Sequence, residues 1–222
     1  MKVTLGSRKN VRLNWFKQEG VPFVLKRELE FSYNENSVLV DTVTPPVYMQ
    51  YSLSGLSKAI PKTNIIVFSE GLPHSYLSTL GSVGDKLLTE KVVDETMNVV
   101  DRIVKVQQGE ESIITKPVPP NERHLFKEIQ IHERQDTIRR KITLKNEGER
   151  LVNGIKVQFI EKKDINYSGA SKEPLEADPP EYTWKVDVPP GKSVAIELVL
   201  KRDVRQTYKI ERDPIPQPKL KR

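Results

Sequence analysis

The sequence predicts a mainly β protein with two β domains. Apolar and polar residues alternate with period two in many short segments, turn residues separate these segments, and 36% of the 222 residues are hydrophobic. A chain of this length is able to bury two small cores. The expected domains are 1–116 and 125–211, joined by a proline-rich linker at 117–124 and followed by an extended tail at 212–222.

The N-terminal domain, 1–116, is expected to form a sandwich or a partly open barrel. Apolar and polar residues alternate over 29–33 and over 47–53, and a polar turn at 34–36 follows the first of these stretches. Residues 65–68 form a short, wholly apolar segment. These lengths and spacings are typical of strands that pack in two layers.

The segment 85–106 has two interpretations. Its apolar residues recur with the spacing of an amphipathic helix, which Gly109 would end. The high content of β-branched residues instead favours strands, with 102–107 and 112–115 as a hairpin. The helical pattern is the stronger of the two, so we expect a helix near 85–106.

The C-terminal domain, 125–211, has the clearest pattern. Alternation predicts strands at 125–131, 138–144, 155–159, 182–188, 194–200 and 204–210. Asn153-Gly154 is suited to a tight turn, and Pro189-Pro190-Gly191-Lys192 predicts a hairpin between its flanking strands. The polar segment 166–180 is expected to be a surface loop. Together these elements predict an immunoglobulin-like β-sandwich.

Three stretches of this domain resemble a known family. They are residues 141–146 (Lys-Ile-Thr-Leu-Lys-Asn), residues 155–159 (Ile-Lys-Val-Gln-Phe) and residues 184–193, which run from Trp184 through Pro-Pro-Gly to Ser193. Over about residues 126–210 the chain resembles an immunoglobulin-like domain family of unknown function, found in the C-terminal half of mucoidy-inhibitor-like proteins. The resemblance implies a fold and almost no function. The long coiled coil expected in those proteins is missing from this chain.

Composition limits the function classes. The formal net charge is +6, and residues 201–222 hold eight Lys or Arg against three Asp or Glu, a surplus of five. The chain has no cysteine, which excludes disulfides, thiolate metal sites and thiol nucleophiles. We expect neither a secretory leader nor a membrane span, so a cytoplasmic or virion-associated location is favoured. Sixteen prolines and many Lys, Glu, Val and Ile residues suit a heat-stable protein.

The three histidines, His74, His124 and His132, are the first candidates for chemistry. His74 precedes a serine but lies in no nucleophile elbow, and a turn role is expected. His124 and His132 are expected on one face of a strand, roughly 13 Å apart, which is too far for one metal ion. The sequence therefore predicts no catalytic residue, no metal site and no cofactor, and a hydrolase is disfavoured.

The candidate binding features are the 166–180 loop and the tail. Prolines at alternate positions block helix and sheet pairing in the tail, which is either a disordered solubility tail or an extended arm that binds a partner. The candidate partner-binding residues are Tyr167, Pro214, Pro216, Pro218, Lys219, Lys221 and Arg222. The leading hypothesis is a non-catalytic structural or interaction protein that self-assembles or docks into a larger assembly, as a cell-envelope, virion or scaffold component.

The alternative hypothesis is a nucleic-acid-binding protein. Basic and aromatic residues interleave near the start of the chain, as on surfaces that bind single strands. The candidate residues are Arg8, Lys9, Arg12, Trp15 and Lys17, together with the basic tail. Packing of Trp15 with Val11 and Leu13 in a core is the simpler explanation of this segment.

Overall fold

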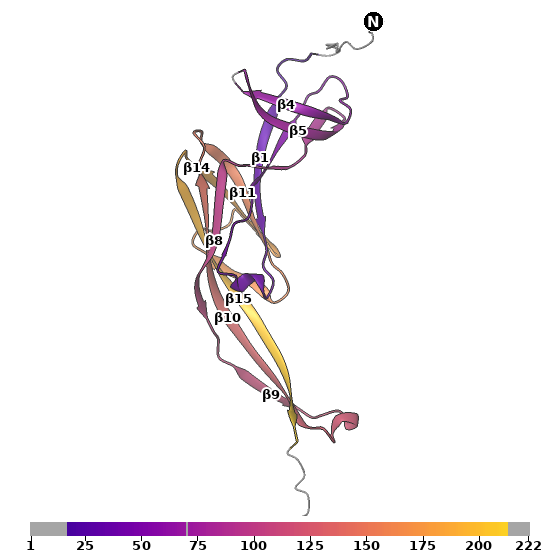
Figure 1. Ribbon diagram of the computed structural model, residues 1–222, viewed down its shortest axis with the longest axis vertical. Helices are drawn as coiled ribbons and strands as arrows, with labels where there is room; N and C mark the ends of the chain where they lie inside the picture. Colours follow the sequence, from indigo (N-terminus) through magenta and orange to yellow (C-terminus); the bar gives the residue numbers. More distant parts are fainter. Residues whose placement is uncertain (1–16, 70, 213–222) are drawn as a thin grey trace, which may run out of the picture. The chain divides into compact units, whose positions relative to one another are not determined.

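The computed structural model describes residues 17–69 and 71–212 and confirms the mainly β class. The chain divides into two compact units (Figure 1). Unit 1 contains Met1–Lys26 and Met49–Val92, and unit 2 contains Arg27–Tyr48 and Val93–Arg222. These units do not follow the expected domain boundary near residue 116. The expected linker, 117–124, lies inside unit 2, between two strands that pair with each other.

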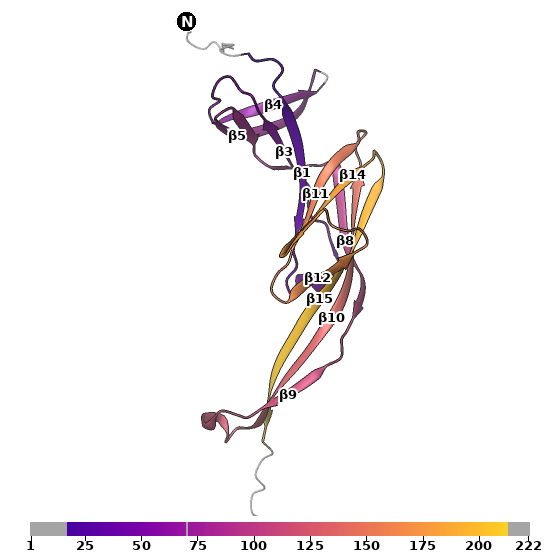
Figure 2. The ribbon, with the colours of Figure 1, turned by 180° about the vertical axis from the view of Figure 1, so that it is seen from behind.

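The first sheet of unit 2 combines strands from both halves of the sequence. Its order is β13 (Glu176–Asp178), β14 (Glu181–Val188), β11 (Val152–Ile160) and β1 (Phe23–Phe31). Strand β1 pairs with β11 in parallel, with Leu29 opposite Val157 and Phe31 opposite Phe159 (Figure 2). A strand from the N-terminal region therefore completes the C-terminal sandwich. It pairs with a strand that lies far away in the sequence.

The second sheet of unit 2 is built on two long strands, β10 (Phe126–Asn146) and β15 (Ser193–Glu211). They pair antiparallel along nearly their full length and run side by side in Figures 1 and 2. The remaining strands of this sheet are β12 (Ile165–Ala170), β8 (Met97–Gln107), β2 (Thr42–Val43) and β9 (Ser112–Lys116).

The core of unit 2 lies between these two sheets. Inward residues of both are fully buried, among them Trp184 and Phe159 from one sheet and Ile138 and Leu198 from the other. The indole Nε1 of Trp184 donates a hydrogen bond to the carbonyl of Lys172, 2.8 Å away. The buried ring therefore keeps its polar atom satisfied. Two short 3₁₀ helices complete the unit, η1 (Ser37–Leu39) and η2 (Pro120–Glu122).

Unit 1 is a smaller antiparallel sheet. It contains β3 (Tyr48–Leu53), β6 (Lys86–Thr89), β5 (Leu72–Val83) and β4 (Thr63–Ser69), paired in that order. Its buried side chains among the described residues are Tyr51, Leu56, Leu77, Thr79, Leu87 and Thr89. The short strand β7 (Val92–Val93) pairs with β3. Strand β4 is a sheet edge.

The helix expected near 85–106 is wrong. This segment forms β6, β7 and β8, and burial in β8 alternates, with Met97, Val99 and Asp101 buried. Its β-branched residues fit a pleated surface, and pairing of β8 with β10 provides hydrogen bonds for its backbone groups. The alternative hairpin is also wrong, because β8 and β9 both pair with β10 and not with each other.

Three expectations for the C-terminal half need correction. Segments 125–131 and 138–144 belong to the single strand β10, and segments 194–200 and 204–210 to the single strand β15, because the ladder continues through their polar middles. The expected 166–180 loop contains most of β12 and all of β13.

Of the two expected turns, one is a bulge within a strand, and the other forms but joins no hairpin. Asn153-Gly154 is a bulge in β11, where Gly154 adopts a φ of 65°. Residues 189–192 do form a tight turn, in which the amide of Lys192 donates to the carbonyl of Pro189, 3.1 Å away. The strands that it joins, β14 and β15, belong to different sheets and so form no hairpin.

Candidate functional site

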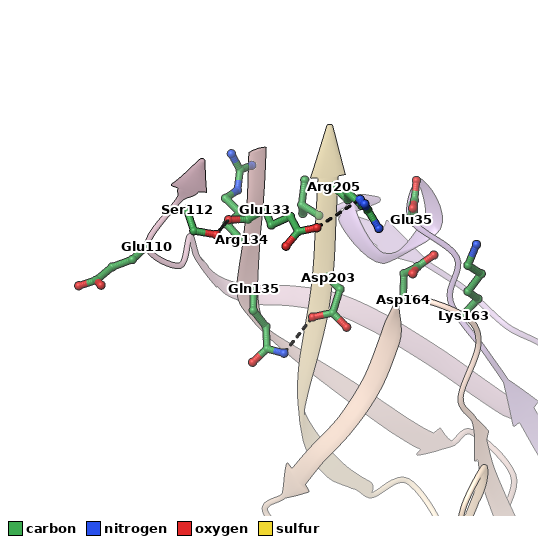
Figure 3. A pocket seen from close by; sticks show the side chains of 11 residues that line it. Glu35, Glu110, Ser112, Glu133, Arg134, Gln135, Lys163, Asp164, Asp203 and Arg205 are labelled. Atoms are coloured by element: carbon green, nitrogen blue, oxygen red, sulfur yellow. Dashed lines mark hydrogen bonds and ion pairs between the residues drawn. The ribbon is translucent and has the colours of Figure 1, made fainter. Parts of the chain in front are cut away.

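A polar hollow of about 730 Å³ lies in unit 2 (Figure 3). The neighbouring strands β10 and β15 form one wall, and the loops that precede η1, β9 and β12 complete the lining. The lining residues are Glu35, Glu110, Ser112, Glu133, Arg134, Gln135, Lys163, Asp164, Asp203, Val204 and Arg205.

Pairing within the hollow accounts for part of its charge. Glu133 and Arg205 reach toward one another from neighbouring strands, with Oε1 and Nε 3.2 Å apart (Figure 3). The amide Nε2 of Gln135 donates to Oδ1 of Asp203 at 2.9 Å. Exposed ion pairs of this kind contribute little free energy. The hollow is therefore a mixed-charge recess whose internal pairs add little to stability.

A buried carboxylate, Asp136, fixes one wall of the hollow. Its Oδ1 accepts hydrogen bonds from Arg134 Nε at 3.0 Å and from the Gly109 amide at 3.2 Å. Arg202 Nη1 lies 3.7 Å from the other carboxylate oxygen. These contacts tie the segment before β9 to β10, so Asp136 has a structural role.

A second buried cluster centres on Arg140 and Asp101, with 0% and 2% of their surfaces exposed. Arg140 Nε and Nη2 donate to the two carboxylate oxygens of Asp101 at 2.9 and 3.1 Å. Arg140 Nη1 donates to the carbonyls of Val38 and Val40, both at 2.8 Å. The hydroxyl of Tyr33 donates to Asp101 Oδ2 at 2.8 Å. The cluster therefore fastens the η1 segment to β8 and β10.

The largest apolar exposure in unit 1 lies on one face of its sheet, which we call the outer face. Ile66 pairs with Tyr76, so both side chains share this face, opposite the buried Leu77. The exposed apolar residues of the outer face are Ile66, Phe68, Tyr76, Leu80, Val83 and Leu88, which are between 49% and 86% exposed. The paired residues Asn64 and Ser78, and Lys86 opposite Val83, lie on the same face, and the Ser78 hydroxyl donates a hydrogen bond to the Glu90 carboxylate.

Comparison with known proteins gives no relative. No family model, curated protein or solved structure matches the chain. The resemblance of residues 126–210 to an immunoglobulin-like family therefore stays a resemblance. Within residues 17–69 and 71–212, no helix has the length and apolar character needed to cross a membrane.

The histidines do not come together. His132 lies in β10, where its ring packs edge-on against Tyr208 and its Nδ1 is 3.2 Å from Glu111 Oε2. His124 precedes β10, so the expectation that both share one strand face is wrong. His74 belongs to β5. Among the described residues, no group of three or more His, Asp or Glu side chains is arranged to hold a metal ion.

The predicted partner-binding residues are only partly placed. Tyr167 lies in β12 and packs against Tyr182, with ring centroids 4.1 Å apart, and against Trp184. It therefore belongs to the edge of the core. Pro214, Pro216, Pro218, Lys219, Lys221 and Arg222 lie outside the described residues.

Of the candidate nucleic-acid-binding residues near the start of the chain, the structure describes only Lys17. Lys17 forms an ion pair with Glu19 at 2.5 Å, and both side chains are exposed. Arg8, Lys9, Arg12 and Trp15 lie outside the described residues.

Sequence reasoning missed the outer face. The apolar run at 65–68 was recognised as a strand, but its exposed side was not. The signal that points to it is the apolar residue Tyr76 on the next strand, which pairs with Ile66 and shares its face.

Proposed function

We propose that this protein is a non-catalytic interaction module that docks into a larger assembly through the outer face of unit 1. The observation that carries the proposal is the exposure of six large apolar side chains on one face of the sheet, over strands β4, β5 and β6. Monomeric soluble proteins seldom expose large contiguous apolar patches unless a partner covers them.

The chemistry of the outer face suits a protein partner with an apolar surface of its own. Its six apolar side chains form two groups, which are separated by the polar pair Asn64 and Ser78. One group is Ile66, Phe68 and Tyr76, and the other is Leu80, Val83 and Leu88. Protein interfaces usually combine apolar contacts with hydrogen-bonding groups. Tyr76 and Phe68 supply the aromatic groups that most often act as anchors.

The buried charges of unit 2 support a structural role. Arg140, Asp101 and Asp136 are hydrogen-bonded to other protein groups and hold strands and loops together. Their contacts stabilise unit 2 and leave the outer face of unit 1 as the leading candidate for an external contact.

A comparative pull-down tests the proposal. Tyr76→Lys and Leu80→Lys place charges in the outer face at positions 73% and 76% exposed, so the fold is expected to survive. Thr207→Lys adds the same charge on an exposed site of unit 2 and serves as the control. We expect the partners captured by the wild type to be retained by the control and lost from both outer-face variants. Equal capture by all four proteins would refute the proposal.

A further inference from the structure

Among residues 17–69 and 71–212, strand β4 pairs only with β5, so its other side is a sheet edge without the usual protection against pairing. Its sequence, Thr-Asn-Ile-Ile-Val-Phe-Ser, has no charge and no proline over seven residues. Sheet edges normally carry charges, prolines, bulges or short strands that prevent contact with another chain. Uncharged segments rich in β-branched residues are the ones that pair most readily.

The other edge strands of the described residues do carry such protection. Strand β13 reads Glu-Ala-Asp, β2 has two residues and β9 ends on Lys116. Strand β12 contains a bulge between Tyr167 and Gly169. The irregularity in the β4–β5 ladder places the extra residue on β5, because Val67 pairs with Ser75 and Phe68 with Pro73. Strand β4 therefore stays regular.

We propose that β4 pairs antiparallel with β4 of a second copy of this chain, about a two-fold axis at Ile66. This inference goes beyond the proposed function, because it rests on the strand edge and not on the outer face. In this register Ile66 lies opposite Ile66 of the other copy, and Ile65 lies opposite Val67. No charged residue of β4 faces another, so no like-charge repulsion opposes the pairing.

The pairing also has consequences for the outer face. Directly opposite side chains on antiparallel strands are about 5 Å apart, and diagonal neighbours about 7–8 Å, within reach of an aromatic ring. Phe68 of one copy is the diagonal neighbour of Ile66 of the other. The apolar residues Ile66, Phe68 and Tyr76 of the two copies would thus adjoin one another across the axis.

Disulfide trapping tests the pairing in the full chain. The protein has no cysteine, so a single introduced cysteine reports on one position. In the proposed register the two copies of residue 66 have Cα atoms about 4.5–5.5 Å apart, within disulfide range. Tyr76→Cys is the control, because the two copies of residue 76 would be three strand spacings apart, about 14 Å.

We expect Ile66→Cys to form covalent dimer under mild oxidation about tenfold or more faster than Tyr76→Cys. Ile66→Lys places two ammonium groups at the axis, and we expect it to weaken dimerisation in sedimentation experiments about tenfold or more. Equal cross-linking at positions 66 and 76 would indicate face-to-face packing and overturn the β4 register.

A wild type that stays monomeric, with no cross-linking at position 66, would also overturn the pairing. The proposed function is judged separately, because Tyr76→Lys leaves the β4 edge intact and removes only the outer-face contact. Loss of partner capture by Tyr76→Lys in a monomeric protein would leave the proposed function standing without the dimer.

Discussion

Arg140 holds Asp101 in a two-pronged ion pair inside the sandwich of unit 2, with both side chains almost fully buried. The remaining donor nitrogen of the pair binds two carbonyls of the η1 segment, and the guanidinium lies 4.8 Å from the centre of the Tyr33 ring. A buried charge of this kind is costly when its partner is removed. This cluster therefore offers the sharpest tests of the fold.

Replacement of Arg140 by methionine is expected to lower the free energy of unfolding by about 3–5 kcal/mol, because Asp101 stays buried without its counter-ion. Chemical denaturation measures this change. Lys141→Met is the matched control, since Lys141 is the next residue and forms only a partly exposed pair with Glu197. Its effect is expected to stay within about 1 kcal/mol. Similar effects of both substitutions would contradict the structural role of Arg140.

The raised pKa of the Tyr33 hydroxyl predicts that the protein loses stability at alkaline pH. Burial, and then the neighbouring Asp101 carboxylate, raises the pKa of the Tyr33 hydroxyl far above its ordinary value of 10.0, while Arg140 opposes this. The unfolded chain loses this proton near pH 10 and the folded chain keeps it. The contribution is therefore complete below pH 10 and is lost as the pH rises above it.

The slope of the free energy of unfolding above pH 10 measures this contribution. Tyr33→Phe is expected to reduce the slope by about 1.4 kcal/mol per pH unit, the value for one proton. The pKa values of Tyr167 and Tyr182 are also raised, chiefly by burial, so a smaller slope is expected to remain. An unchanged slope in Tyr33→Phe would show that this hydroxyl titrates normally.

The lowered pKa of the Asp94 carboxyl predicts that the protein loses stability in acid. Burial acts to raise the pKa of Asp94, but hydrogen bonds from Thr96 and Arg27 outweigh it and lower the pKa below its ordinary value of 3.8. Its contribution to stability is therefore present above pH 3.8 and is lost as the pH falls below it. We expect Asp94→Asn to flatten the acid unfolding curve, while Glu95→Gln, at an exposed neighbour, leaves the curve unchanged.

The close approach of Gly109 to the backbone of β10 predicts that a side chain does not fit at this position. A Cβ at this position would lie 2.2 Å from the carbonyl oxygen of Gln135, which belongs to the backbone of β10. Gly109→Ala is expected to lower the melting temperature by several degrees, because overpacking of this kind costs about 1–3 kcal/mol. Gln108→Ala, one residue earlier on the surface, is expected to have no such effect.

The alternation of apolar residues predicted most strands of the C-terminal half, because a sheet that buries one face imposes period two on its sequence. The same alternation indicates that Arg140 points into the core, because it lies between the inward residues Ile138 and Ile142 on the same face of the strand. The helix expected near 85–106 failed because β-branched residues satisfy both spacings, and pairing with β10 decided between them. The parallel contact of β1 with β11 joins residues more than 120 positions apart, and local patterns carry no information on it.

The outer face was missed for a related reason. Apolar residues at 65–68 predict a strand, but period and composition do not tell whether a second layer covers it. Sequence reasoning instead favoured the charged tail, because unusual composition is easier to recognise than an exposed surface.

The docking role of unit 1 is tested most directly by its removal. The chain leaves unit 2 at Tyr48 and returns at Val93, and the Asp94 amide donates to the Val47 carbonyl at 2.8 Å, so a linker of about four Gly and Ser residues spans the gap. A variant with residues 27–48, this linker and residues 93–222 keeps all of unit 2. Quantitative pull-down, with folding verified by circular dichroism, compares it with the full chain. We predict a folded variant that captures none of the full chain's partners, whereas capture of the same partners would contradict docking through unit 1.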